Sequence, residues 1–375
     1  MHSTLNDTSV LSLEASVMGA WSSHPAPESK SQIFLTGATG YIGGQTLHAI
    51  ASTIPSSQVA IACLVRSAEK GKLVQNAYPE HVRTVLGDLD DVGIIEKECQ
   101  KAQVVLQLAD TKHMRAARAI VKGLSAQLKD SHPCYIQMSG ASMFVIPEIE
   151  GDHYGEPPST MWNDLNGISS ILSTIQAHPS REMDNYILSL DSTIIRTGLV
   201  VGPLIYGHGE GPGNQRSIQA PTIARKTIQD GEGFRFRRGL NTWSNVHIRD
   251  LGDLFALLTK TALDGPRNTR TSALWNETGV YLPANGDMTF GKLCEAVARA
   301  AHVQGLIKKD AIDRTIDVDE ANAAMPGGAV FWGTNAVYKS SRAQVLLGWT
   351  PSAPSLGESI AQMVRLEGED RKGGS

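Results

Sequence analysis

Short apolar runs alternate with amphipathic segments along the first third of the chain. The apolar runs that we expect to form buried strands are 32–36, 59–65, 82–86, 102–108 and 134–138. The segments between them are typical of helices, because apolar residues recur there every three or four positions, at 42–53, 68–76, 92–101 and 113–129. Parallel strands joined by helices through short loops predict an α/β protein with a doubly wound parallel sheet.

The pattern becomes less regular after residue 140. An apolar run at 192–201 predicts another buried strand, and helical patterns recur near 217–230, 250–263 and 289–303. We therefore expect three parts, namely an N-terminal extension at 1–30, a Rossmann core at 31–200 and a smaller substrate lobe at 201–375. The lobe is expected to interleave with the last core elements, because no independent second pattern of strands and helices is present.

Composition limits the classes of function. The 375 residues are 41% hydrophobic and 19% charged, as in ordinary globular proteins, and the net charge of −4 gives no electrostatic reason to expect nucleic acid as a partner. No run approaches the ~20 apolar residues that would span a bilayer, so we expect no membrane segment and a cytoplasmic protein. The four cysteines lack metal-ligand spacing, and we expect no metal site.

A glycine-rich turn follows the first predicted strand and opens the first predicted helix. Gly37 permits a tight turn, Gly40 lets the backbone approach a pyrophosphate, and Gly43 lets helix and strand pack closely. The pyrophosphate would lie on the free N–H groups of the helix N-terminus. This context predicts a dinucleotide site formed by Gly37, Thr39, Gly40, Tyr41, Ile42 and Gly43.

The end of the second predicted strand indicates which dinucleotide is bound. NAD-specific sites place a carboxylate there on the ribose 2′-hydroxyl, whereas this chain has Arg66. A guanidinium can pair with a 2′-phosphate through two hydrogen bonds. We therefore predict NADP(H) as the cofactor, with NAD(H) as the less favoured alternative.

Several short motifs occur in a fixed order between residues 31 and 365. They are the glycine turn, 87–89 after the third strand, Ser139 at the end of the fifth, 196–203 with 205–207, 245–251 and 347–351. In this order they resemble the extended short-chain dehydrogenase/reductase superfamily, of the NAD-dependent epimerase/dehydratase type. The resemblance implies the same fold and a nicotinamide dinucleotide as cofactor.

The resemblance also implies roles for single residues. Asp88 and Leu89 would contact adenine, and Ala109 would line the ribose path. Leu199 and Pro203 would pack near the nicotinamide, and Ser139 would hydrogen-bond a substrate oxygen. His247 and Asp250 belong to a motif that is usually structural, with Asp250 placed to cap a helix beginning at Leu251. Pairing through helices at 113–129 and 167–190 implies a homodimer.

The usual acid/base pair of this superfamily is missing. It is a tyrosine four residues before a lysine on one helix, a spacing that puts both side chains on one face. No tyrosine here is followed by lysine at that spacing, and no lysine occurs between Lys129 and Lys226. If 181–184 ends the corresponding helix, Gln176 and Ser180 replace the pair.

Two interpretations follow from this departure. Hydride transfer can proceed with another proton donor, for which Tyr154, His153 and His178 are candidates, while Ser139 orients the substrate. Alternatively, the dinucleotide is retained without net redox turnover, in an isomerase, a cyclase or an NmrA-like redox-sensing regulator. The first interpretation predicts an NADP(H)-dependent oxidoreductase acting on a small organic carbonyl, imine or enone.

A loop rich in glycine and polar residues follows the 196–203 motif. Loops at the carboxyl ends of parallel strands are where such folds bind ligands. The candidates for contact with a small-molecule substrate are therefore Tyr206, His208 and Asn214 of this region, together with Trp243.

Overall fold

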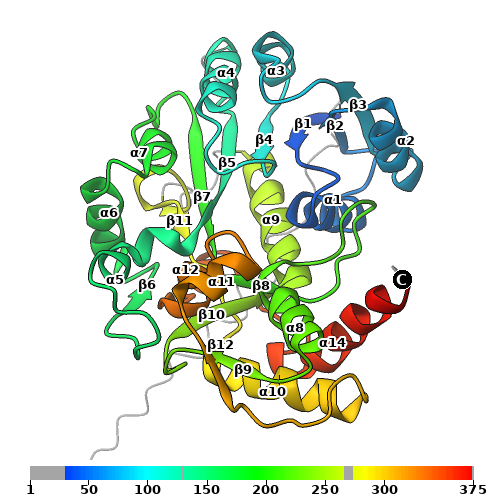
Figure 1. Ribbon diagram of the computed structural model, residues 1–375. Coiled ribbons are helices and arrows are strands. Elements are labelled where there is room, and N and C mark those ends of the chain that lie inside the picture. The colour runs from blue at the N-terminus through cyan, green and yellow to red at the C-terminus, as the bar shows by residue number, and fades with distance from the viewer. Residues whose placement is uncertain (1–29, 129–130, 266–272, 374–375) are drawn as a thin grey trace, which may run out of the picture.

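The computed structural model describes residues 30–128, 131–265 and 273–373 (Figure 1). The extension expected at 1–30 lies outside the described residues except for Lys30. The five expected core strands are present as β1 (Ser31–Thr36), β2 (Val59–Val65), β3 (Val82–Leu86), β4 (Val104–Gln107) and β5 (Cys134–Gly140). With β7 (Arg196–Gly202) and β11 (Val280–Tyr281) they form one seven-stranded sheet.

The sheet has the order β11-β7-β5-β4-β1-β2-β3, and each of its neighbouring pairs is parallel. The predicted α/β fold with a doubly wound parallel sheet is confirmed. β1 pairs with β2 on one side and with β4 on the other, so the strand order reverses at β1. In open α/β sheets, ligands bind beyond the carboxyl ends of the strands at such a reversal.

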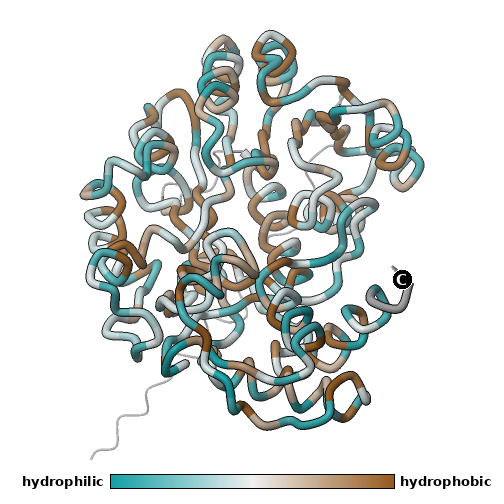
Figure 2. The backbone as a smooth tube through the Cα atoms, in the orientation of Figure 1, coloured by the Kyte–Doolittle hydropathy of each residue, from teal (hydrophilic) through white to brown (hydrophobic). Residues whose placement is uncertain are grey.

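Helices cover both faces of this sheet because successive strand residues point to opposite faces. Ile33 and Leu35 of β1 join an apolar cluster with α1 (Tyr41–Thr53) and α9 (Ile248–Leu263). Phe34 points the other way, into a cluster with α3 (Val92–Cys99), α4 (Met114–Ser125) and α7 (Glu182–Leu188). Figure 2 shows hydrophilic and hydrophobic residues mixed along α3 and α4, as expected for helices with one face on a sheet.

The C-terminal lobe lies below the sheet in the view of Figure 1 and is built around a second, three-stranded sheet. That sheet consists of β8 (Leu204–Tyr206), β10 (Thr242–His247) and β12 (Gly286–Thr289). Two strand pairs flank it, β9 (Phe234–Phe236) with β13 (Arg314–Ile316) and β6 (Met161–Asn163) with β14 (Val337–Lys339). The large helices of the lobe are α8 (Gln219–Asp230), α10 (Phe290–Val303) and α14 (Leu356–Gly373).

Shorter helices connect these parts. They are α2 (Ala68–Ala77), η1 (Ala141–Phe144), α5 (Ile146–Glu150), α6 (Ile168–Ala177), η3 (Asn276–Thr278), α11 (Val318–Ala324), α12 (Gly328–Gly333) and α13 (Arg342–Leu347). The segment 167–190 therefore forms two helices, α6 and α7, separated by a turn that contains Pro179. Proline interrupts a helix because it lacks an N–H and its ring clashes with the preceding turn.

Hydrogen bonds join two of the sequence motifs, 245–251 and 347–351, to each other. The Asp250 carboxylate accepts hydrogen bonds from the N–H groups of Ser352 (2.8 Å) and Ala353 (3.1 Å), and its carbonyl accepts one from the Trp349 indole (2.9 Å). The prediction that Asp250 caps a helix starting at Leu251 is wrong. Helix α9 begins at Ile248, and its cap is His247, whose Nδ1 accepts from the Arg249 N–H at 3.1 Å.

The His247 cap makes folding stability depend on pH. Burial lowers the pKa of His247 from 6.5 to about 4, with the Arg249 charge acting in the same direction. Between pH 6.5 and about 4, the histidine of the unfolded chain is protonated while that of the folded chain stays neutral. The folded state therefore loses stability as the pH falls from 6.5 toward 4.

We expect the free energy of unfolding in urea to fall by about 2 kcal/mol between about pH 7 and about pH 4.5 because of this histidine. His247→Asn keeps a capping side chain without a titrating ring, so its curve should lack that fall. Parallel curves for the two proteins would show that His247 is not responsible.

Candidate functional site

The glycine turn joins β1 to α1 in a compact form. Gly37 has a φ of +83°, in the left-handed region, and a Cβ there would lie 2.8 Å from the backbone nitrogen of Ala109. The Gly40 N–H donates to the Gly37 carbonyl at 2.8 Å and closes the turn. At Gly43 a Cβ would overlap the Gly37 carbonyl oxygen, so only glycine lets helix and strand approach this closely.

The N-terminus of α1 lies at the glycine turn and has no side-chain cap. Its N-cap is Gly40, which makes no side-chain cap hydrogen bond, and the first turn contains no acidic residue. The first N–H groups of a helix have no partner within the helix and lie at the positive end of its dipole. This end of α1 therefore fits the pyrophosphate of a dinucleotide.

The other predicted cofactor residues gather at the same edge of the sheet, with one exception. Ala109 is exposed after β4, where its N–H donates to Thr36 Oγ1 at 3.3 Å. Arg66 is exposed directly after β2, and Asp88 is exposed after β3 with Leu89 half-buried beside it. These positions follow the line that a bound dinucleotide takes across such a sheet.

Leu199 is the exception. It lies inside β7, paired in register with Gln137 and 1% exposed, two residues short of the level of Ser139. The expectation that it packs near the nicotinamide is not supported, because it belongs to the apolar core beneath the sheet edge. Pro203, which follows the last residue of β7, lies at the edge itself.

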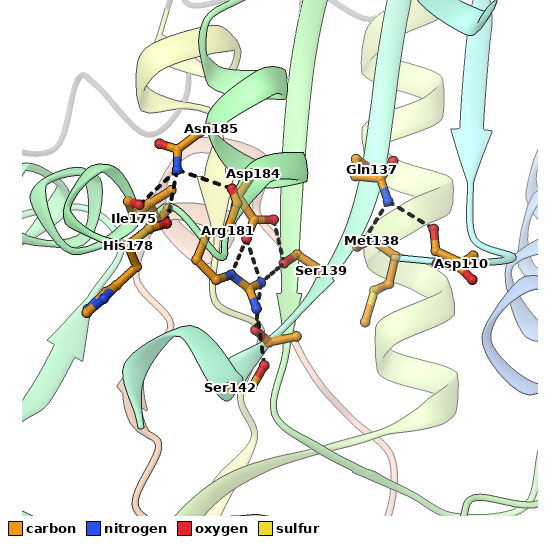
Figure 3. A network of polar contacts seen from close by, with 11 residues as sticks. Asp110, Gln137, Met138, Ser139, Ser142, Ile175, His178, Arg181, Asp184 and Asn185 are labelled. Carbon is orange, nitrogen blue, oxygen red and sulfur yellow. Dashed lines mark hydrogen bonds and ion pairs between the residues drawn. The ribbon is translucent and has the colours of Figure 1, made fainter. Parts of the chain in front are cut away.

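A buried polar network surrounds Ser139, the next-to-last residue of β5 (Figure 3). The Ser139 hydroxyl donates to Asp184 Oδ1 at 2.7 Å and accepts from Arg181 Nη2 at 2.9 Å. Arg181 Nε donates to Asp184 Oδ2 at 2.6 Å, and Arg181 Nη1 donates to the Ser142 hydroxyl at 3.1 Å. Arg181 and Asp184 come from the start of α7, so that helix positions two charged groups on the strand end that carries Ser139.

The electrostatics of this network are those of a buried carboxyl held by a cation. The Asp184 side chain is 1% exposed and that of Arg181 is 12% exposed. Burial raises the pKa of Asp184, while the Arg181 charge and the hydrogen bond from Ser139 act against that rise. Burial dominates, so the carboxyl takes up a proton more readily than an exposed aspartate.

The residues that contact Ser139 in the structure are not the ones that the sequence led us to expect. Gln176 and Ser180 are both exposed and do not contact Ser139, so their assignment as replacements for the tyrosine and lysine is wrong. The turn at Pro179 shifts the register, and Arg181 and Asp184 reach Ser139 instead. The sequence indicates the helix break, because Pro179 lies between the two positions, but it does not indicate which residues then reach Ser139.

The proposed proton donors lie away from this network. Figure 3 shows the His178 ring pointing away from Ser139, and His178 contributes only its carbonyl, which accepts from Asn185 at 3.4 Å. Tyr154 packs edge to face on Phe236, with ring centroids 6.1 Å apart, and the Arg237 guanidinium lies 5.4 Å from its ring centroid. His153 is exposed. Neither Tyr154 nor His178 contacts Ser139 in this structure, so geometry gives neither a role in proton transfer there.

The loop predicted to bind substrate lies on the glycine turn. The Tyr41 hydroxyl donates to the Gly207 carbonyl at 2.7 Å, and the Asn214 N–H donates to the Thr39 carbonyl at 3.0 Å. His208 and Asn214 have exposed side chains there. Residues 207–215 thus cover the turn from the side of the lobe.

Two substrate candidates have structural roles instead. Tyr206 is 1% exposed and its hydroxyl donates to the Pro354 carbonyl at 2.9 Å. Trp243 is 2% exposed and its indole donates to the Thr334 carbonyl at 2.7 Å. Their polar groups are already satisfied within the lobe, because both sit on strands of its central sheet. A small pocket lies beside Tyr206 and His208, between the loop, α8 and α14.

The described residues contain neither a metal-binding cluster nor a membrane-spanning helix. Across residues 30–128, 131–265 and 273–373, no three His, Cys, Asp or Glu side chains converge in a way that could hold a metal ion. None of the helices described combines the length and apolar character needed to cross a membrane.

Solved structures with related folds cover almost the whole chain. PbgP3 from Burkholderia pseudomallei has a TM-score of 0.62 with 14% identity, covering 92% of this chain and 98% of its own. DesIV, a dTDP-glucose 4,6-dehydratase from Streptomyces venezuelae solved with NAD and DAU bound, has a TM-score of 0.60 with 14% identity, covering 91% and 98%. At this identity the likeness concerns the fold.

Sequence comparison adds a nearer relative. No family model matches the chain. The protein named Oxidase ucsJ, from an Acremonium species, is 31% identical over 344 residues, which cover 90% of this chain and 98% of the relative. The chain belongs to the family of this oxidase. An uncharacterized protein of Saccharomyces cerevisiae is 23% identical over 242 residues, covering 62% of this chain and 72% of its own.

The chain has the serine that the resemblance implies at the end of β5 and differs at the residues that contact it. Ser139 stands at the strand end, while Arg181 and Asp184 lie where a tyrosine and a lysine were expected to face it. The dinucleotide turn has the form that its glycines predict.

Proposed function

We propose that this protein is an NADP(H)-dependent oxidoreductase that acts on a small organic carbonyl, imine or enone. The observation that carries the proposal is the uncapped N-terminus of α1 at the glycine turn, on the sheet edge that also holds the Ser139 network. The name of the 31% identical relative, an oxidase, supports redox chemistry, and the NAD bound in DesIV supports the class of cofactor.

Different residues of the chain would bind the cofactor and the substrate. The amides of Tyr41 and Ile42 would hold the pyrophosphate, Asp88 and Leu89 the adenine, and Pro203 the nicotinamide side. When bound, the dinucleotide supplies or accepts hydride. Ser139 would bind the substrate oxygen at the end of β5, and residues 207–215 would exclude water from the turn.

The proposal is tested by following the absorbance of reduced nicotinamide in purified protein mixed with panels of ketones, cyclic imines and enones. Substrate-dependent loss of absorbance supports the proposal. Tight NADPH binding without turnover of any panel member would favour the alternative, a dinucleotide-bound protein without net redox chemistry. The absence of the tyrosine–lysine pair is the observation that keeps this alternative in view.

Arg66 gives the sharpest test of cofactor choice. Arg66→Asp should weaken NADPH binding by about 10- to 100-fold and NADH binding by less than about threefold, because only NADPH carries the 2′-phosphate. Dissociation constants come from calorimetric titration with each nucleotide. Arg365→Asp makes the same charge change on an exposed arginine of α14 and should alter neither constant.

Equal losses for both nucleotides in Arg66→Asp would contradict the assignment of NADP(H). The assignment of the glycine turn as a dinucleotide site would be unaffected, and any preference between NADPH and NADH would have to come from other residues.

A further inference from the structure

Ser139, which is 1% exposed at the end of β5, has one hydrogen-bonding position that its two partners leave unused. A hydroxyl has one hydrogen to donate and two lone pairs to accept with. Ser139 gives its hydrogen to Asp184 Oδ1 at 2.7 Å and accepts from Arg181 Nη2 at 2.9 Å. One acceptor position remains, and it belongs to a side chain at the carboxyl edge of the sheet, where the reacting atoms of a substrate would lie.

We propose that Ser139 and Asp184 form a proton relay that replaces the missing tyrosine and lysine, with Arg181 as the residue that positions both. The inference rests on the proposed function and assigns its acid/base step. The geometry supports it, because a substrate hydroxyl hydrogen-bonded to Ser139 would be two short hydrogen bonds away from a carboxylate that accepts its proton.

The relay carries one proton per hydride transferred, in oxidation and in reduction. In oxidation, the substrate O–H bond breaks and its proton passes to Ser139 Oγ while the Ser139 proton passes to Asp184. The carbinol carbon loses hydride to the oxidised nicotinamide, so two electrons leave the substrate and a carbonyl forms. In reduction, protonated Asp184 returns a proton through Ser139 to the carbonyl oxygen as hydride reaches the carbon. Solvent then exchanges the proton on Asp184.

The surroundings of Asp184 suit a group that changes protonation. Arg181 faces it from the same turn of α7 and Ser139 faces it from β5. Burial raises the pKa of Asp184, and the Arg181 cation limits that rise, so the carboxyl can both take up and release a proton. The phenol of Tyr338 is the other titratable group on which the Arg181 charge acts, and burial raises its pKa strongly.

Tyr338 is the competing proton donor. Its hydroxyl is buried and has no hydrogen-bond partner among the described residues, and its ring lies 5.5 Å from that of Phe144, in the η1 turn that follows Ser139. A tyrosine would resemble the usual donor of the superfamily more closely. Unlike Asp184, however, it makes no hydrogen bond to Ser139 in the structure.

The first experiment measures the proton on Asp184 directly. Infrared difference spectra of the NADPH-saturated protein, recorded across a pH titration, should show a protonated carboxyl band with a midpoint above that of ordinary aspartate. The band should be absent in Asp184→Asn and should shift in frequency in Ser139→Ala. A carboxyl that stays ionised down to about pH 4, or a band that Ser139→Ala leaves unmoved, would overturn the relay.

The second experiment measures turnover with camphorquinone, an activated dicarbonyl, and NADPH. Asp184→Asn should lower kcat by about 100-fold or more and remove the ionisation of this carboxyl from the pH profile, while NADPH affinity measured by calorimetry stays within about threefold. Glu182→Gln is the matched control, since Glu182 lies in the same first turn of α7 but is exposed and paired with Arg118. It should leave kcat unchanged.

The outcomes separate the relay from a merely structural network and from the proposed function itself. A loss of kcat in Tyr338→Phe with none in Asp184→Asn would overturn the relay in favour of the phenol. If Asp184→Asn and Ser139→Ala both lose folding stability, NADPH affinity and kcat together, the network only holds α7 in place and the relay is overturned. Failure of the unmodified protein to bind NADPH would instead reject the proposed function. If the protein binds NADPH but does not reduce camphorquinone, the infrared titration of Asp184 is the test of the relay.

Discussion

Replacing Gly43 with alanine should weaken dinucleotide binding by about 100-fold or more and lower the free energy of unfolding by about 3 kcal/mol. The added Cβ would overlap the Gly37 carbonyl oxygen and come within 2.6 Å of the Gly37 carbonyl carbon. Both are backbone atoms, so α1 must move away from β1, and its amides leave the position that suits a pyrophosphate. Calorimetry with NADPH and urea unfolding measure the two effects.

Gly93→Ala is the matched control for this substitution. Gly93 lies in helix α3, and a Cβ there meets nothing within 4 Å. This variant should bind NADPH normally and be as stable as the original protein or slightly more so, because alanine favours a helix over glycine. If Gly43→Ala behaves in the same way, the close packing at the turn is not what organises the site.

Replacing Asp164 with alanine should destabilise the fold by about 4 kcal/mol. Asp164 is fully buried, and its carboxylate accepts from the N–H groups of Ser341 (2.7 Å), Arg342 (2.8 Å) and Leu282 (3.0 Å). The aspartate thereby joins the end of β6 to β11 and to the start of α13. Its removal leaves three buried donors without partners, each of which costs about 1 to 3 kcal/mol.

Asp191→Ala is the control for Asp164→Ala. Asp191 also accepts from a backbone N–H, that of Thr193 at 2.8 Å, but it is exposed, so water replaces the lost bond. Its effect should stay below about 1 kcal/mol in the same urea experiment. A loss at Asp164 no larger than at Asp191 would mean that the buried donors find other partners.

The cofactor half of the molecule could be predicted from the sequence because its signals are local. Each of the first five strands is a mostly apolar run, and the seven residues from Gly37 to Gly43 contain both the glycines that the turn requires and the amides that would bind the ligand. The strand bounds at 59–65 and 82–86 coincide with those of β2 and β3. Patterns of this kind depend little on residues far away in the sequence.

The Ser139 network could not be predicted because it joins distant parts of the chain. Asp184 and Ser139 are 45 positions apart, and their contact depends on where α7 begins after the break at Pro179. Tyr206 and Trp243 were assigned to the substrate for their chemistry and their place near a glycine-rich loop. Both side chains are buried instead, because they lie on strands whose faces are covered by the lobe's helices.

The account depends most on the turn between β1 and α1 as a dinucleotide site. Calorimetric titration of the purified full-length chain with NADPH tests it directly. We predict saturable heat with one nucleotide per chain and a weaker response to NADH. No heat with NADPH, NADP⁺, NADH or NAD⁺ would contradict the account and leave only the fold.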